Sequence, residues 1–211
     1  MTASSTAPAE LQQLQRKRKQ VVRAGVALWV LLLLVADSRW RVPAPHLQAM
    51  IESVGLALIL ACIVGRTWCT LYIGGHKKRE LVTDGPYSIV RNPLYVFTTI
   101  GAAGVGAQSG SALIALLSAA ASAATFYTIV RREEAFLAAA FPTEFPAYAS
   151  RVPRFWPRLS AWREADELLV KPHLVRRTFL DACLFLLAVP LVDLIDWLRS
   201  LGYLPILFHL P

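Results

Sequence analysis

Charged residues are scarce in this chain of 211 residues. Asp, Glu, Lys and Arg together make up 17% of it and hydrophobic residues 55%, whereas a soluble domain carries about 25% charged residues. The mean hydropathy is +0.47. The shortage of charge argues against a soluble domain and predicts an integral membrane protein.

Acidic residues are scarcer than basic ones, with 14 Asp and Glu against 22 Lys and Arg and a formal charge of +8. Such a balance occurs in nucleic-acid-binding proteins. In a membrane protein, however, an excess of Lys and Arg is typical of the cytoplasmic side. We therefore expect membrane lipids, and no nucleic acid, among the partners.

Cysteine and histidine are also few, at three and four residues. No cysteines form a CxxC pair and no histidines show metal-ligand spacing, so the sequence predicts neither a disulfide framework nor a metal site. The string Gly101-x-x-Gly104-x-Gly106 has the wrong order and context for a dinucleotide fingerprint. It instead favours close helix packing.

Apolar runs dominate the chain, and a run of about 20 residues can cross a bilayer. Five candidates predict an all-α integral membrane protein with about five transmembrane helices. The third and fourth are joined by the turn Ser109-Gly110-Ser111 and predict a helical hairpin. The five are Val21–Ala36, Leu47–Ile73, Leu94–Gln108, Ala112–Val130 and Phe179–Leu198.

Residues outside these runs complete the expected organisation. We expect residues 1–20 to form a disordered basic tail and residues 21–211 a single membrane domain with its motifs within 68–157. Composition suggests an interfacial surface helix over 158–175, with the last transmembrane helix within 176–200.

The distribution of Lys and Arg predicts the orientation. Five lie before or at the start of the first run, four lie between the second and third, and nine lie between the fourth and fifth. The opposite side carries three, namely Arg39, Arg41 and Arg199. The positive-inside rule therefore predicts a multi-pass protein of the bacterial inner membrane, with its N-terminus and both long loops in the cytoplasm.

Two polar segments interrupt the apolar pattern on that predicted cytoplasmic side. Leu81–Tyr95 reads LVTDGPYSIVRNPLY, and Arg131–Pro157 reads RREEAFLAAAFPTEFPAYASRVPRFWP. Gly-Pro and Asn-Pro dipeptides break helices. A connection between two helices does not need so many breakers and polar residues, so these segments predict the walls of a polar pocket.

Both segments resemble the isoprenylcysteine carboxyl methyltransferase family, whose relatives include membrane phospholipid N-methyltransferases. The family pattern is LVT-x-GPY-x-x-x-R-H-P-x-Y, followed by a helical hairpin, paired glutamates, an aromatic-Gly-x-x-aromatic stretch and VP-x-x-x-P. The resemblance covers residues 68–157. It implies a membrane methyltransferase that binds S-adenosylmethionine at a cytoplasmic-face pocket rather than in a separate nucleotide-binding domain.

Specific residues follow from this resemblance. Glu133 is implied as a catalytic residue and a cofactor contact. Arg132 is predicted as a second catalytic residue because its planar guanidinium, like those of Arg91 and Arg131, can hold a carboxylate or phosphate. Aromatic faces suit an adenine or a sulfonium cation, and a carboxylate suits an ammonium or ribose hydroxyls. The implied cofactor-binding residues are Tyr72, Arg79, Glu80, Leu81, Val82, Tyr87, Asn92, Pro93, Leu94, Tyr95 and Glu133.

Three positions depart from the family pattern. Asn92 replaces a histidine, and it cannot titrate near neutral pH as histidine can. Ile129 stands where eukaryotic members carry a substrate-binding arginine. Pro142 replaces the glycine of the aromatic-Gly motif. The first two leave the methyl acceptor and the need for a general base open.

The chemistry implied is an in-line methyl transfer to a lipophilic acceptor, such as the carboxylate of a prenylcysteine-like compound. A carboxylate acceptor needs no base, whereas an amine or thiol would need one, with Glu133 as the candidate. Alternatives are a phospholipid or small-lipid N-methyltransferase, a non-catalytic membrane subunit or transporter using Arg66, and a nicotinamide-dependent reductase.

Overall fold

A computed structural model describes residues 25, 27, 29–31, 33–34, 36–74, 80–204 and 206–210. Half of the predicted first span, Val21–Ala36, lies outside these residues, and its described residues 25, 27, 29–31 and 33–34 are helical. The predicted basic tail and Arg79 lie wholly outside them. The account below concerns the described part of the chain.

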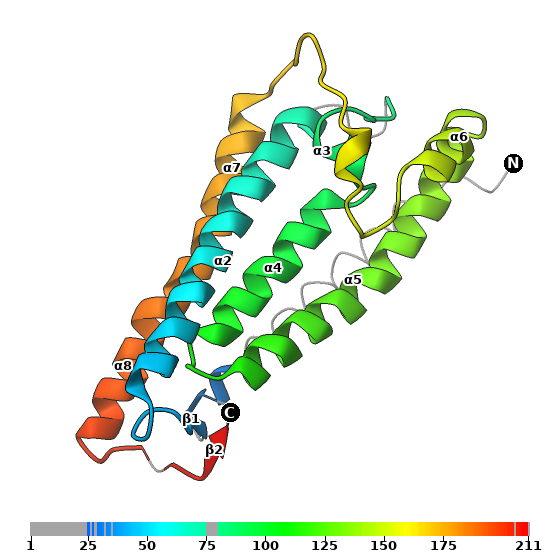
Figure 1. Cartoon of the computed structure of the whole chain (residues 1–211). Helices are drawn as coiled ribbons and strands as arrows, with labels where there is room; N and C mark the ends of the chain where they lie inside the picture. The colour runs from blue at the N-terminus through cyan, green and yellow to red at the C-terminus, as the bar shows by residue number, and fades with distance from the viewer. Residues whose placement is uncertain are drawn as a thin grey trace, which may run out of the picture.

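Helices dominate the described residues (Figure 1). Two short strands, β1 and β2, pair in parallel, with Ala36 opposite Phe208 and Ser38 opposite Leu210. In chain order the elements are β1 Ala36–Ser38, α2 Pro45–Ile73, α3 Pro86–Ile89, α4 Pro93–Ala107, α5 Ala112–Ala140, α6 Glu144–Arg151, the 3-10 turn η1 Leu159–Ala161, α7 Pro172–Cys183, the 3-10 stretch η2 Leu184–Leu187, α8 Ala188–Ser200 and β2 Phe208–Leu210.

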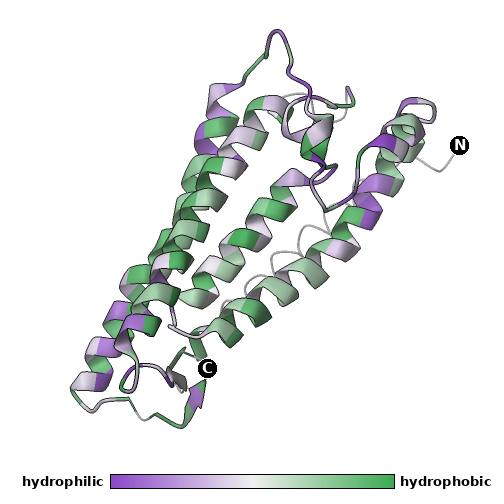
Figure 2. Cartoon of the chain, in the orientation of Figure 1, coloured by the Kyte–Doolittle hydropathy of each residue, from purple (hydrophilic) through white to green (hydrophobic). Residues whose placement is uncertain are grey.

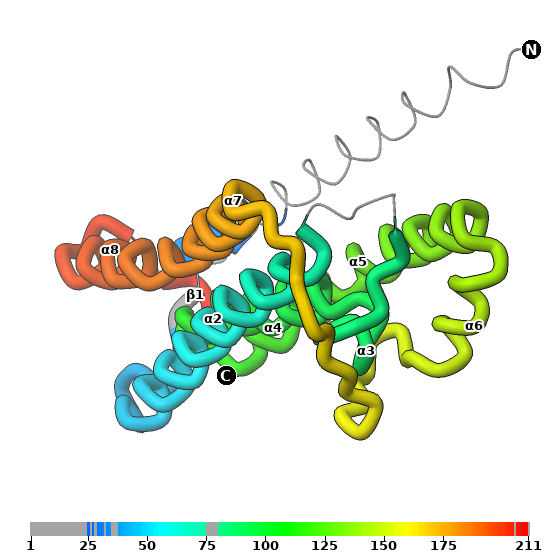
Figure 3. Tube along the Cα trace, turned by 90° about the horizontal axis from the view of Figure 1, so that it is seen from above, coloured from blue at the N-terminus to red at the C-terminus, as the bar shows by residue number. Residues whose placement is uncertain are grey.

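The long helices stand side by side in the order α7, α2, α4, α5, with α2 and α4 in the middle (Figures 1 and 3). The connections α3, α6 and η1 gather at one end of this layer, which we call the motif end. The two strands lie at the other end, which we call the strand end. The polar segments singled out in the sequence therefore share one end of the molecule.

The structure confirms a mostly helical membrane fold. Within the described part of the chain, three helical runs are long and apolar enough to cross a membrane: α2, α5 and the run Pro172–Ser200 formed by α7, η2 and α8. Apolar residues colour the middle of these helices and polar residues their ends (Figure 2). Helix α4, with 15 residues, is apolar but shorter.

Helix boundaries follow from residue chemistry at the ends. Pro45 and Pro93 occupy the first positions of α2 and α4, where the missing N–H costs nothing because it would have no intrahelical partner. The Ser111 hydroxyl caps α5 by accepting a hydrogen bond from the Ile114 N–H at 3.2 Å. The 3-10 stretch η2 precedes Pro190, whose ring disrupts regular helical bonding.

Two sequence expectations need correction. Helix α5 continues to Ala140, ten residues beyond the predicted end at Val130, because Arg and Glu are good helix formers that extend it past the apolar run. The surface helix expected over 158–175 does not form: only η1 and the start of α7 are helical there. Trp162 instead stacks on Trp68 of α2, with ring centroids 5.4 Å apart.

Glycines form the contact between the antiparallel helices α2 and α4. A Cβ on Gly104 would lie 2.6 Å from the Gly55 carbonyl oxygen, and one on Gly101 would lie 2.5 Å from the Cys62 sulfur. Both distances are too short for a side chain, so the backbones approach closely only because these residues are glycine. This supports reading the Gly101–Gly106 string as a packing motif.

Arg66, the arginine within α2, is partly satisfied in this contact, since its buried Nε has no hydrogen-bond partner among the described residues. Arg66 of α2 donates through Nη1 to the Thr98 hydroxyl of α4, and that hydroxyl donates to the Leu94 carbonyl at 2.7 Å. A polar side chain inside the bundle therefore links the two central helices, which fits its position facing protein rather than lipid.

Replacing Gly104 with alanine should destabilise the fold by about 1–3 kcal/mol, because the added methyl forces apart α2 and α4. Thermal unfolding of the purified protein in detergent measures this effect. Gly25→Ala is the matched control, because nothing lies within 4 Å of a Cβ at that position. An equal melting temperature for both variants would contradict close glycine packing.

Candidate active site

Glu134, near the end of α5, joins the two polar segments. Its Oε1 accepts from Arg91 Nε at 3.1 Å and from Asn92 Nδ2 at 3.0 Å. Its Oε2 accepts from Arg154 Nε at 2.9 Å and from Arg154 Nη2 at 2.7 Å. We call these four residues the Glu134 cluster. The segment Leu81–Tyr95, which we call the motif loop, and the later segment Arg131–Pro157 therefore meet, as the sequence predicts.

Backbone contacts hold the same two segments together. The buried Tyr148 hydroxyl donates to the Tyr87 carbonyl at 2.7 Å, and Arg91 Nη1 donates to the Ala149 carbonyl at 2.6 Å. The Arg91 N–H donates to the Pro153 carbonyl at 2.9 Å. These bonds satisfy polar backbone groups that no helix pairs, so the irregular segments have a defined shape.

Tyr87 of α3 is buried, and its hydroxyl has no hydrogen-bond partner among the described residues. Burial raises its pKa well above the usual value, and nearby ionisable groups, including Glu133, raise it further. The pKa of Tyr148 is also raised by burial. Both phenols are thus neutral at physiological pH. A buried, unpartnered hydroxyl is costly unless a ligand satisfies it.

The Tyr87 side chain packs among buried residues at the motif end. It belongs to an apolar cluster with Cys69 and Tyr72 of α2. Gly85, with φ of 57°, turns the chain here and leaves room for the Tyr72 ring, as only glycine readily can. The Tyr72 hydroxyl donates to Glu164 at 2.6 Å.

The other predicted cofactor residues lie around this apolar cluster in different environments. Asn92 uses its amide nitrogen in the Glu134 cluster, and Tyr95 packs on Phe126 with ring centroids 4.7 Å apart. Glu80 is exposed and Pro93 buried, while Leu81, Val82 and Leu94 are half-buried. Their contact with a cofactor remains a prediction.

The paired glutamates occupy opposite environments. Glu133 and Arg132, the predicted catalytic residues, are exposed, whereas Glu134 is only 7% exposed. Sequence reasoning missed Glu134, although a signal exists: Phe126, Val130 and Glu134 recur at four-residue spacing on one buried face. Their helical period places Glu134 on the buried face and leaves Glu133 exposed.

Comparison with known proteins identifies the class. The family model described as "Phospholipid methyltransferase" matches residues 54–144, a span that contains the motif loop, the helical hairpin and the paired glutamates. The chain belongs to this family of membrane proteins. No solved structure matches it.

Two curated relatives align with nearly the whole chain. Nickel-cobalt-cadmium resistance protein NccN of Alcaligenes xylosoxydans xylosoxydans is 36% identical over 206 residues, which are 97% of this chain and 95% of the relative. Cobalt-zinc-cadmium resistance protein CzcN of Cupriavidus metallidurans is 37% identical over 191 residues, 90% of this chain and 87% of the relative. Among the described residues, no group of three or more His, Cys, Asp and Glu could hold a metal ion.

Substitution Glu134→Ala should destabilise the protein by about 3 kcal/mol, because it leaves two arginines without their buried partner. Glu133→Ala is the matched control, since Glu133 is exposed, and it should change stability by less than about 0.5 kcal/mol. Thermal unfolding of both variants in detergent measures the difference. Similar melting temperatures would show that the Glu134 cluster contributes little to the fold.

Proposed function

We propose that this protein is an S-adenosylmethionine-dependent methyltransferase that transfers a methyl group to a lipophilic acceptor. The observation that carries the proposal is the buried Tyr87 hydroxyl, which has no hydrogen-bond partner among the described residues, at a point where the two family motifs meet. Membership of a family described as phospholipid methyltransferase supports the same reaction. When bound, the cofactor supplies an electrophilic methyl group on a sulfonium.

The residues around the motif loop suit the parts of such a cofactor. The Tyr87 hydroxyl can donate to or accept from a polar atom, and the Tyr95 ring offers an aromatic face. Glu133 is exposed and forms no ion pair with the described residues, so its carboxylate is available for an ammonium or ribose hydroxyls. Arg132, also exposed, can hold a carboxylate through its guanidinium.

Glu134 has a different role from Glu133. Both of its oxygens accept hydrogen bonds from guanidinium or amide groups, so it is a poor proton acceptor and acts as a positioning residue. It fixes Arg91 and Asn92 at the start of α4, and through them the loop that carries Tyr87. Alignment and exclusion of water are then the main contributions of the protein.

The acceptor determines whether a base is needed. A carboxylate acceptor is already ionised and requires none, whereas an amine must lose a proton, for which Glu133 is the candidate. Asn92 cannot substitute, because it does not titrate and its amide nitrogen is already bound to Glu134. Base treatment of a radiolabelled methylated product distinguishes the two, since it releases a methyl ester but not a methylated amine.

Titration with S-adenosylhomocysteine tests the cofactor site. Tyr87→Phe should weaken binding by about two- to tenfold, the cost of one lost hydrogen bond, without unfolding, because the hydroxyl has no protein partner in the described part of the chain. Glu133→Ala should weaken binding at least as much. Calorimetry in detergent gives the dissociation constants.

The control for this titration is Tyr203→Phe, an exposed tyrosine near the strand end, which should bind like the wild type. Absence of binding to the wild type would remove the cofactor proposal. Unchanged binding by Tyr87→Phe would exclude Tyr87 from the site.

The names of the two relatives favour a second candidate function, a role in resistance to cobalt, nickel or cadmium. Growth of a metal-sensitive bacterium expressing this protein tests it, with Glu133→Ala as the comparison. Protection by the wild type but not by the variant would connect resistance with the proposed site. Protection by neither would reject the role.

A further inference from the structure

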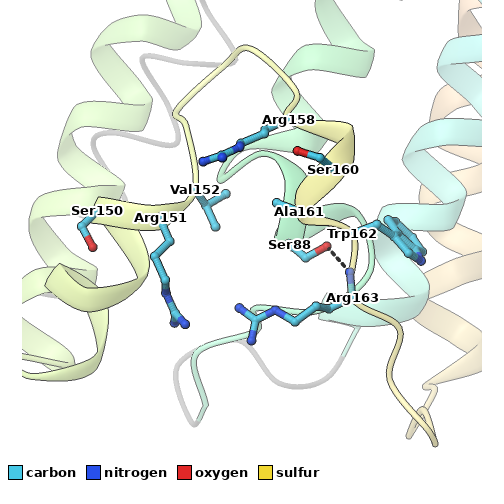
Figure 4. Close-up of a pocket in the computed structure, with 9 residues that line it drawn as sticks. All are labelled: Ser88, Ser150, Arg151, Val152, Arg158, Ser160, Ala161, Trp162 and Arg163. Atoms are coloured by element: carbon cyan, nitrogen blue, oxygen red, sulfur yellow. Dashed lines mark hydrogen bonds between the residues drawn. The ribbon is translucent and has the colours of Figure 1, made fainter.

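A basic cavity of about 520 Å³ lies at the motif end, beside the candidate active site. Its walls come from α3, from the end of α6 and from the segment around η1 (Figure 4). Ser88, which follows Tyr87 in sequence, lies in its wall, and the Arg163 side chain extends toward the end of the Arg151 side chain (Figure 4). The lining residues are Ser88, Ser150, Arg151, Val152, Arg158, Ser160, Ala161, Trp162 and Arg163.

Three arginines and no acid line this cavity. None of the three forms an ion pair with a described carboxylate; Arg151 Nε donates only to the Ala147 carbonyl of its own helix, at 3.2 Å. Glu164 follows Arg163 in sequence, but its oxygens accept from the Tyr72 hydroxyl and the Trp162 indole. Like charges around one space repel, and an anion between them relieves that repulsion.

The arginines stand on a fixed backbone. The Arg163 N–H donates to the Ser88 hydroxyl at 3.0 Å, and its carbonyl accepts from the Gly85 N–H at 2.7 Å. The Arg158 N–H donates to the Ile89 carbonyl at 2.9 Å. The two arginines use only main-chain atoms in these contacts, so the backbone that carries them is fixed while both exposed guanidinium groups stay available for a ligand.

The surroundings indicate where the anion comes from. Trp156 and Leu159, on either side of Arg158, are 86% and 75% exposed. Exposed tryptophan beside arginine at the end of apolar helices is typical of the membrane–water interface. A guanidinium matches a phosphate through two parallel hydrogen bonds. We propose that this cavity binds the phosphate group of an anionic phospholipid. Binding here requires no methyl transfer and is independent of the proposed function.

Calorimetric titration of the purified full-length protein in nonionic detergent tests the proposal, with short-chain phosphatidylglycerol as the probe. The double variant Arg158→Gln/Arg163→Gln should bind about tenfold more weakly or worse, since it loses two charge-assisted contacts. The matched control is Arg176→Gln/Arg177→Gln, which removes the same charge from exposed positions of α7 and should bind within about twofold of the wild type.

Two further probes identify what is recognised. Short-chain diacylglycerol has the same acyl chains without phosphate and should bind at least about tenfold more weakly. Inorganic phosphate should compete only at much higher concentration than the lipid. Equal loss of binding in both double variants, or equal binding of diacylglycerol, would overturn the site. Inorganic phosphate binding as tightly as the lipid would overturn the lipid source.

Discussion

The buried carboxylate of Glu134 is the contact on which the motif end depends. It lies between the guanidinium groups of Arg91 and Arg154 and also accepts from Asn92. Removing an ion from water costs several kcal/mol, and its interactions offset this cost only when every partner is in place. The arrangement therefore tolerates little displacement of either polar segment. Short helices and irregular stretches, which have few regular hydrogen bonds of their own, obtain a defined geometry from this requirement.

The glycine contact between α2 and α4 holds the two helices from which the motif end extends. Inside a bilayer the hydrophobic effect does not drive helices together, so association relies on close packing and on polar contacts. Gly55 and Gly104 allow the first, and Arg66 with Thr98 supplies the second. Because the motif loop connects these two helices, their fixed separation also fixes the distance the loop must span.

Helix α3 separates two environments with different chemistry. Tyr87 belongs to a buried aromatic cluster, which suits a cofactor with an adenine and a sulfonium. Ser88, the next residue, lines the basic cavity. Adjacent residues on one turn point in different directions, so the proposed cofactor contact of Tyr87 and the proposed lipid-phosphate site at Ser88 can lie on different sides of one short helix. Both proposals thus place their ligands near the membrane surface.

The sequence by itself determined the membrane class, the bounds of α2 and α4 to within about two residues, the helical hairpin and the family. Apolar runs and proline positions carry that information locally. It did not determine which glutamate of the pair is buried, or that residues 162–171 are irregular. Those outcomes were decided by tertiary contacts, of Glu134 with Arg91 and of Trp162 with Trp68. Such contacts join residues distant in the chain, where local propensity and composition hold no information about the partner.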